Sequence, residues 1–111
     1  MYASTDTGVY RFSYPPEKYR QSFDSDPTSV VVNIPCCGHS TRTLEFDEEG
    51  RLYVSIGSAT NIDNDSSRSR VVRFNVTVVP QQWSSGEVFA DGLRNEVGLR
   101  RDPRGRLWGV E

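Results

Sequence analysis

One histidine occurs in the 111 residues, and it lies in the stretch CCGHSTRTLEF, residues 36–46. Histidine titrates near neutrality, so it can take a proton from a bound hydroxyl group. Fifty-five residues after His39 comes Arg94, followed by Asn95, in the stretch FADGLRNEVGL, residues 89–99. A neutral imidazole beside a guanidinium suits proton abstraction with stabilisation of the negative charge that develops. His39 and Arg94 are therefore candidate catalytic residues, provided that the fold brings them together.

Structural roles compete with this interpretation. A single histidine in a loop is more often structural or solvated than catalytic. Arg94 could end a strand or pair with Glu96, and Asn95 could be a turn residue. A serine nucleophile activated by His39 is disfavoured, because Ser40 is its direct neighbour and successive side chains of a strand point to opposite faces.

The two cysteines, Cys36 and Cys37, are adjacent, and with a single histidine they exclude a tetrahedral Cys/His zinc site within the chain. Small, half-buried thiols are the first expectation, because free cysteine is commonly buried. A bond between the two, or to partners outside the segment, is the alternative. The stretch DNDSS, residues 63–67, is rich in oxygen ligands but lacks the glycine and the distant glutamate of an EF-hand. We expect a solvated insertion there and assign no metal ligands.

Composition narrows the class of protein. Thirteen Lys and Arg against fifteen Asp and Glu give a net charge of −2 and a pI near 5.4, without the basic excess that nucleic-acid binding needs. No apolar run approaches the roughly 18 residues of a membrane span. Residues 1–12 have neither the basic start nor the apolar core of a signal peptide, so no export signal is expected in the chain. Two sequons, at Asn64 and Asn75, weakly favour a secreted protein.

An internal repeat indicates which elements carry the candidate residues. LEFDEEGRLYV (44–54) resembles LRRDPRGRLWGV (99–110), with Leu, Asp, Gly, Leu and an aromatic residue recurring at a constant offset of 55. In each copy, turn formers separate an incoming apolar segment from an outgoing aromatic one, which predicts a β-hairpin. The outgoing strand occurs three times, near residues 1, 52 and 107.

A repeat of this length, made of strands and turns without an amphipathic-helix pattern, is typical of four-stranded propeller blades. Residues 14–27 have too many prolines and polar residues for a central strand, so a long loop or a blade edge is expected there. The sequence thus predicts an all-β domain over residues 1–111, a partial β-propeller of about two four-stranded antiparallel blades. A closed propeller needs about four to eight blades, so the chain alone is expected to be poorly stable or to oligomerise.

The repeat also relates the two candidates to each other. Counting back from the equivalent residues Leu44 and Leu99, His39 corresponds to Arg94. Adjacent blades would then place them side by side on one rim, where loops can face the central channel. Arg42 and the run LRRDPRGR (99–106) are expected on a charged, exposed hairpin face.

Taken together, CCGHSTRTLEFDEEGRLYVSIGSATN (36–61), SRVVRFNV (69–76) and EVFADGLRNEVGLRRDPRGRLWGVE (87–111) resemble the glucose/sorbosone dehydrogenase family. These are soluble quinoproteins that bind pyrroloquinoline quinone (PQQ). The resemblance implies a six-bladed propeller with PQQ and calcium in its central channel.

The resemblance also implies roles for single residues. His39 matches the base that takes the substrate hydroxyl proton while hydride passes to the quinone. Arg94 matches the arginine beside the reactive quinone carbonyl, and Asn95 the residue that follows it at the cofactor. Cys36 and Cys37 stand where glycines are usual, so a stiffer backbone is expected before His39.

For the complete protein, the resemblance implies a PQQ-dependent sugar, aldose or sorbosone-type dehydrogenase acting on a small sugar or polyol. It favours an extracellular or periplasm-like location. Most ligands of PQQ and calcium would lie outside this chain, in the rest of the propeller, so the chain alone is expected to be inactive. The alternatives are a non-catalytic propeller that binds protein or carbohydrate and a lactonase-type propeller, which would need a carboxylate-bound divalent metal.

Overall fold

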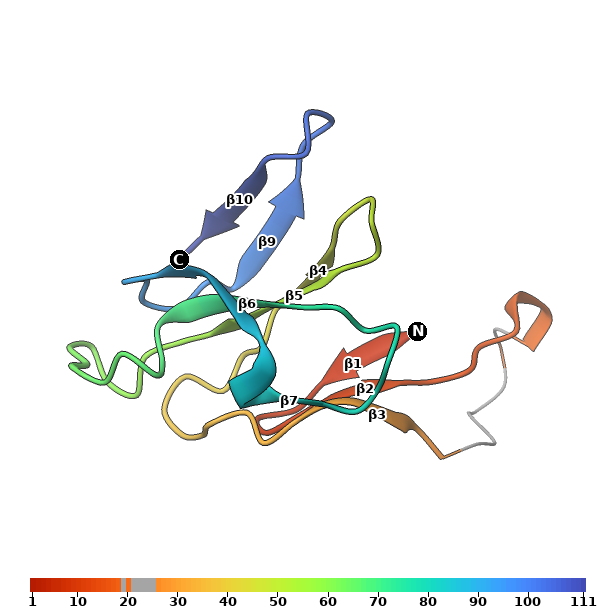
Figure 1. The fold of residues 1–111 in the computed structure, drawn as a ribbon, viewed down its shortest axis with the longest axis horizontal. Helices are drawn as coiled ribbons and strands as arrows, with labels where there is room; N and C mark the ends of the chain where they lie inside the picture. The colour runs from red at the N-terminus through yellow and green to blue at the C-terminus, as the bar shows by residue number, and fades with distance from the viewer. Residues whose placement is uncertain (19, 21–25) are drawn as a thin grey trace.

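The computed structural model describes residues 1–18, 20 and 26–111, which form three β-sheets (Figure 1). Among these residues, no helix is long and apolar enough to cross a membrane. The elements are β1 (Tyr2–Ser4), β2 (Val9–Arg11), η1 (Pro16–Lys18), β3 (Thr28–Val32), β4 (Leu44–Phe46), β5 (Leu52–Ile56), β6 (Arg70–Phe74), β7 (Gln81–Gln82), η2 (Trp83–Ser85), β8 (Glu87–Asp91), β9 (Gly98–Arg101) and β10 (Leu107–Val110), where η is a short 3₁₀ helix.

The sheets form two four-stranded blades and a hairpin. The first sheet has the order β1-β2-β3-β7, the second β4-β5-β6-β8, and the third is the hairpin β9–β10. All pairs are antiparallel except β3 with β7, which is parallel and two residues long. The prediction of an all-β partial propeller with about two blades is confirmed. The fourth strand of the first blade, β7, is parallel to β3, whereas an antiparallel strand was expected. Strand β7 comes from the segment after β6, and its Gln82 Oε1 accepts a hydrogen bond at 2.6 Å from the side-chain amide of Asn33, the residue after β3.

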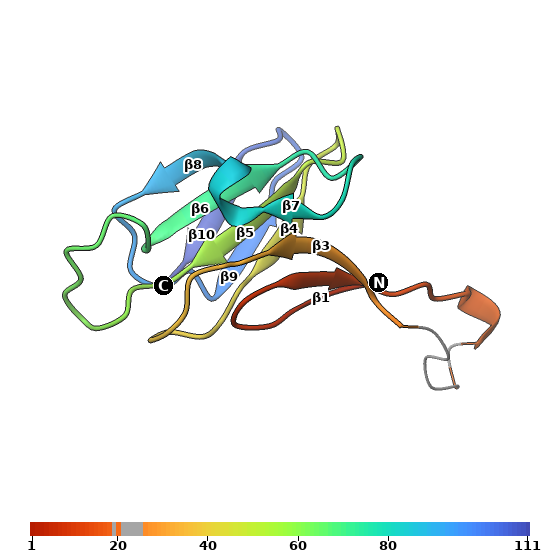
Figure 2. The same cartoon turned by 60° about the horizontal axis from the view of Figure 1, so that its bottom comes forward.

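The second sheet lies between its two neighbours, as Figure 1 shows and as the rotated view in Figure 2 supports. Strand β5 is buried along its whole length and contributes to both faces. Leu52, Val54 and Ile56 pack with the first sheet in the main core, which includes Val9 and Val31. From the opposite face of the second sheet, Tyr53 and Val71 pack with Leu99 of the third. Stacking of successive sheets through such apolar faces is how propeller blades are held together.

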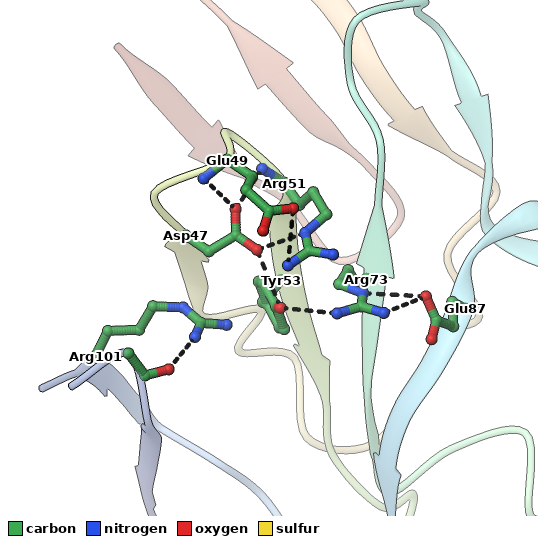
Figure 3. Close-up of polar contacts among 8 residues, drawn as sticks. Asp47, Glu49, Arg51, Tyr53, Arg73, Glu87 and Arg101 are labelled. Carbon is green, nitrogen blue, oxygen red and sulfur yellow. Dashed lines mark hydrogen bonds and ion pairs between the residues drawn. The ribbon is translucent and has the colours of Figure 1, made fainter.

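Each of the two repeated hairpins forms the same pattern of hydrogen bonds around an aspartate, which explains why their sequences match. The Asp47 carboxylate accepts from the backbone N–H of Glu49 and Arg51, from Arg51 Nε and from the Tyr53 hydroxyl. One repeat later the Asp102 carboxylate accepts in the same pattern, from the backbone N–H of Arg104 and Arg106, from Arg106 Nε and from Trp108 Nε1. Figure 3 shows that the Asp47 network continues through Tyr53 to Arg73 and Glu87.

Residues 14–27, expected to be a loop or a blade edge, lie partly outside the described residues. Their described part holds η1 and no strand.

Candidate functional site

His39 and Arg94 lie on two loops that meet at one residue. His39 belongs to the loop between β3 and β4, and Arg94 to the loop between β8 and β9. The His39 N–H donates to the Ser58 carbonyl at 3.1 Å, and the Ser58 N–H donates to the Arg94 carbonyl at 2.7 Å. Ser58 follows β5 and is buried. The backbone of Ser58, two residues after β5, therefore bonds to both loops and fixes the position of His39 relative to Arg94 along the chain.

Asn95 joins the same cluster from the Arg94 side. Its Oδ1 accepts a hydrogen bond from the Thr41 hydroxyl at 3.0 Å, so the two loops are also linked through side chains. A Cβ atom on Gly57 would lie 2.4 Å from Asn95 Oδ1 and 2.8 Å from His39 Cβ. Only a glycine at position 57 leaves room for His39 and Asn95 to approach each other in this way.

The Arg94 guanidinium is exposed and donates through Nη2 to Asn61 Oδ1, while its backbone N–H donates to the Glu111 carboxylate. Among the described residues Arg94 makes no ion pair with Glu96, which was one alternative for it. Glu96 is instead buried, and its carbonyl accepts from Thr43 and Ser55. Burial, with the nearby charge of Glu111, raises the pKa of Glu96. Among the described residues, the exposed Arg94 guanidinium thus has the Asn61 amide as its only hydrogen-bond partner.

A cleft of about 440 Å³ lies between Arg94, with the end of β8, and the loop after β5, which includes Ser58. The aspartates of that loop are already neutralised. Asp63 accepts two hydrogen bonds from the Arg68 guanidinium, which also forms an ion pair with Asp65 at 2.8 Å. In the described part of the chain, no group of three or more His, Cys, Asp or Glu side chains could hold a metal ion. The Asp63 and Asp65 carboxylates of this loop are therefore paired with Arg68.

The expectation of half-buried thiols before His39 is wrong. Cys36 and Cys37 are exposed and are joined to each other by a disulfide bond. The next residue, Gly38, has φ +116°, and a Cβ there would lie 2.3 Å from the Ala59 Cα. The backbone leading into His39 is thus constrained by a covalent ring and by a close contact with the loop after β5.

Arg42 is also misplaced by the sequence prediction, which put it on an exposed face. Its side chain is only 5 % exposed, and its guanidinium donates to the carbonyls of Pro35, His39 and Thr41. The rest of the predicted charged face is mixed. Arg100, Arg104 and Arg106 are exposed, whereas Leu99 is buried and Arg101 lies over the Tyr53 ring with its guanidinium carbon 4.3 Å from the ring centre.

Comparison with known proteins agrees with this architecture. The whole chain, residues 1–111, matches the family model described as TrAA12-like. The chain belongs to the TrAA12-like family. Two solved structures of the carbohydrate-active enzyme family AA12 from Trichoderma reesei, an iodide and a calcium structure, are 32% and 31% identical to this member. Their TM-scores are 0.87 and 0.85, and in each the match covers 99% of this chain and 30% of the other.

A further similarity is to a dehydrogenase described as dependent on PQQ. The TrAA12-like chain is 27% identical over 110 residues to a pyrroloquinoline quinone-dependent pyranose dehydrogenase of Coprinopsis cinerea, a match covering 81% of this chain and 15% of that protein. The holo form of the PQQ domain of a pyranose dehydrogenase from the same organism matches the fold with a TM-score of 0.85 at 24% identity, covering 97% of this chain and 29% of that one. The chain thus spans a small part of each relative.

Three contributors to this TrAA12-like site were missed by sequence reasoning. Ser58 acts through its backbone, which no residue type signals. Arg42 looked like one charge among many. Gly57 did carry a signal, because a glycine at the end of a β-branched strand often marks a close backbone approach.

Proposed function

We propose that this chain is part of a PQQ-dependent sugar dehydrogenase in which His39 is the general base and Arg94 and Asn95 contact the quinone. The observation that carries the proposal is the meeting of the two loops at Ser58, because a potential base and an exposed guanidinium then belong to loops bonded to the same residue. The similarity to a PQQ-dependent pyranose dehydrogenase and to AA12 structures supports the choice of cofactor and of a sugar or polyol substrate.

The residues present fit a quinone that carries carboxylates and carbonyl oxygens. The Arg94 guanidinium is exposed and has donors to spare beyond its bond to Asn61, and a planar guanidinium matches such oxygens well. Asn95 adds an amide, and the missing side chain at Gly57 lets Asn95 approach His39 closely. When bound, PQQ supplies a hydride acceptor. Calcium, which one AA12 structure holds by its description, would need ligands from other parts of the protein.

The chain's own residues would move the proton and stabilise charge. The backbone of His39 is fixed on both sides, by the bond from its N–H to Ser58 and by the bond from Arg42 to its carbonyl. A neutral imidazole held in this way can accept the proton of a substrate hydroxyl. The positive charge of Arg94 lowers the energy of the negative charge that develops on the reacting groups.

The test is calorimetric titration of the complete protein with PQQ, with calcium present. Wild type is expected to bind tightly with one quinone per site, and Arg94→Ala to bind at least about tenfold more weakly, because a charge-assisted contact is lost. Arg104→Ala, at an exposed position on the β9–β10 hairpin, is the matched control and should bind as wild type does. Absence of binding by wild type would contradict the proposal and favour a non-catalytic propeller that binds protein or carbohydrate.

The lactonase-type alternative has no support in the described residues, because no group of three or more His, Cys, Asp or Glu side chains among them could hold a metal ion. The two sequon asparagines, Asn64 and Asn75, are exposed, which supports the proposal of an extracellular location.

A further inference from the structure

The Arg42 guanidinium bonds to the backbone of the loop that carries His39. Nη1 donates to the His39 carbonyl at 2.7 Å and to the Thr41 carbonyl at 2.9 Å, and Nη2 donates to the Pro35 carbonyl at 3.1 Å. The acceptors are thus the carbonyl of His39 itself and one carbonyl on each side of it in the sequence. One side chain thus ties together the beginning, the middle and the end of the segment 35–41.

These bonds matter because the segment has little regular structure of its own. Residues 33–43, between β3 and β4, contain no strand or helix, so their carbonyls depend on donors from elsewhere. The planar guanidinium has five N–H groups in a fixed fork, which lets one side chain satisfy several carbonyls at once. A lysine at this position would offer the same charge but only a single nitrogen.

The surroundings show that Arg42 is there for the carbonyls and not for an ion pair. The side chain is 5 % exposed, and none of the ion pairs in the described part of the chain includes it. Burial lowers the pKa of Arg42, and the charge of Asp6, in the turn between β1 and β2, partly opposes this effect. The backbone is anchored as well, because the Ser4 hydroxyl donates to the Arg42 carbonyl at 2.7 Å.

We infer that Arg42 is a positioning residue for His39, a buried clamp that joins the 35–41 loop to the first blade and sets the direction of the imidazole. This inference rests on the proposed function for the role of His39. The clamp itself rests on the hydrogen bonds alone. Arg42 does not touch the substrate and acts only through the loop.

The clamp is tested by hydrogen exchange on the complete protein. In Arg42→Lys and Arg42→Met, backbone amides of residues 36–41 should exchange at least about tenfold faster than in wild type, while β5 and β6 keep their protection. Arg73→Met is the matched control, because it removes a half-buried arginine of β6 whose guanidinium is bonded to Glu87 and Tyr53 rather than to this loop. It should leave exchange at 36–41 unchanged. Arg42→Lys keeps the charge and so tests the clamp even if Arg42→Met does not fold.

The link to His39 is tested by steady-state kinetics with PQQ and a pyranose substrate. Arg42→Lys should lower kcat by roughly ten- to a hundredfold, with KM and quinone affinity within about twofold of wild type, because a misaimed base slows the chemical step and leaves binding intact. A general loss of stability would not produce this split.

Each failure has its own meaning. Unchanged exchange at 36–41 in a folded Arg42→Lys protein would refute the clamp. Faster exchange with unchanged kcat would refute the positioning of His39. A wild-type protein without quinone-dependent turnover would overturn the proposed function, and with it the role of His39, whatever the exchange data show for the loop.

Discussion

At the scale of single residues, the candidate site depends more on backbone contacts than on side-chain pairs. His39 is held through its N–H and its carbonyl, and Ser58 links it to Arg94 through main-chain atoms on both sides. Gly57 contributes by the absence of a side chain. The Arg94 guanidinium also bonds to Asn61 in the loop after β5, whereas the hydrogen bonds that join these loops in the described residues do not use the His39 imidazole.

His39→Gln in the complete protein should remove most turnover and leave PQQ binding largely intact. A glutamine fills similar space but cannot accept a proton as a base, and loss of a general base lowers rate by roughly 10²–10⁴-fold. Comparison of kcat with the calorimetric affinity for quinone measures both effects. Ser40→Ala, at the exposed neighbouring position, is the control. Turnover of His39→Gln close to that of wild type would end the assignment.

At the scale of elements, the repeated hairpins are built around one aspartate each. In the β4–β5 hairpin the Asp47 side chain is only 6% exposed, so its four hydrogen bonds are shielded from water. In the β9–β10 hairpin the Asp102 side chain is 18% exposed and its arginine partner 59%. The same residue pattern therefore contributes more to stability in the blade that is covered on both faces.

Asp47→Asn should destabilise the complete protein by about 1–3 kcal/mol at neutral pH, because a nearly buried acceptor of a charged donor is lost. Burial of the Asp47 carboxyl opposes ionisation, but hydrogen bonds from the Arg51 backbone, the Arg51 guanidinium and the Tyr53 hydroxyl outweigh it and lower its pKa. A carboxyl with a lowered folded-state pKa stabilises fully above its unfolded pKa, about 3.9, and loses this contribution as pH falls towards the folded value.

The melting temperatures of wild type and Asp47→Asn should therefore differ at pH 7 and converge below about pH 4. Glu48→Gln, on the exposed side of the same turn, controls for the loss of one negative charge. A constant difference between wild type and Asp47→Asn down to pH 3 would show that ionisation of Asp47 is not what stabilises the hairpin.

At the scale of the whole molecule, edge strands of the second and third sheets keep apolar side chains in contact with solvent. Val88 and Phe89 of β8 are 45% and 44% exposed, and Trp108 and Val110 of β10 are 59% and 63% exposed. Clusters of exposed apolar residues on sheets mark surfaces that other protein covers. The contact between the second and third sheets is an example of such a covered surface, because Tyr53 and Leu99 are buried where these two sheets meet.

The isolated 111-residue chain should therefore self-associate or unfold with little cooperativity. Light scattering over a range of concentrations is expected to show a rising mass, and Trp108→Arg with Val110→Lys should reduce that rise by placing charge on the exposed strand. Arg104→Lys on the same hairpin is the control. It leaves Trp108, Val110 and the net charge unchanged, so it should leave the rise in mass unchanged. A monomer with a sharp cooperative melt would contradict this expectation.

Much of the architecture could be predicted from local pattern. The offset of 55 between the two hairpins identified β4–β5 and β9–β10, because each hairpin needs an aspartate, a glycine with positive φ and an aromatic residue at the same places. The parallel strand β7 was not predictable, since two glutamines carry no strand signal and their pairing with β3 depends on where the chain returns after β6.

By itself, the sequence determined the class of fold and predicted that His39 and Arg94 lie on equivalent loops, because repeat spacing converts directly into equivalent positions on adjacent blades. Only the tertiary structure decided what supports that pair. Whether Arg42 faces water or three carbonyls, and whether Cys36 bonds to Cys37, depends on how the loop between β3 and β4 folds against β5. Hydrogen bonds to backbone carbonyls can be made by any well-placed donor, so residue type does not reveal them, and only packing selects the partner.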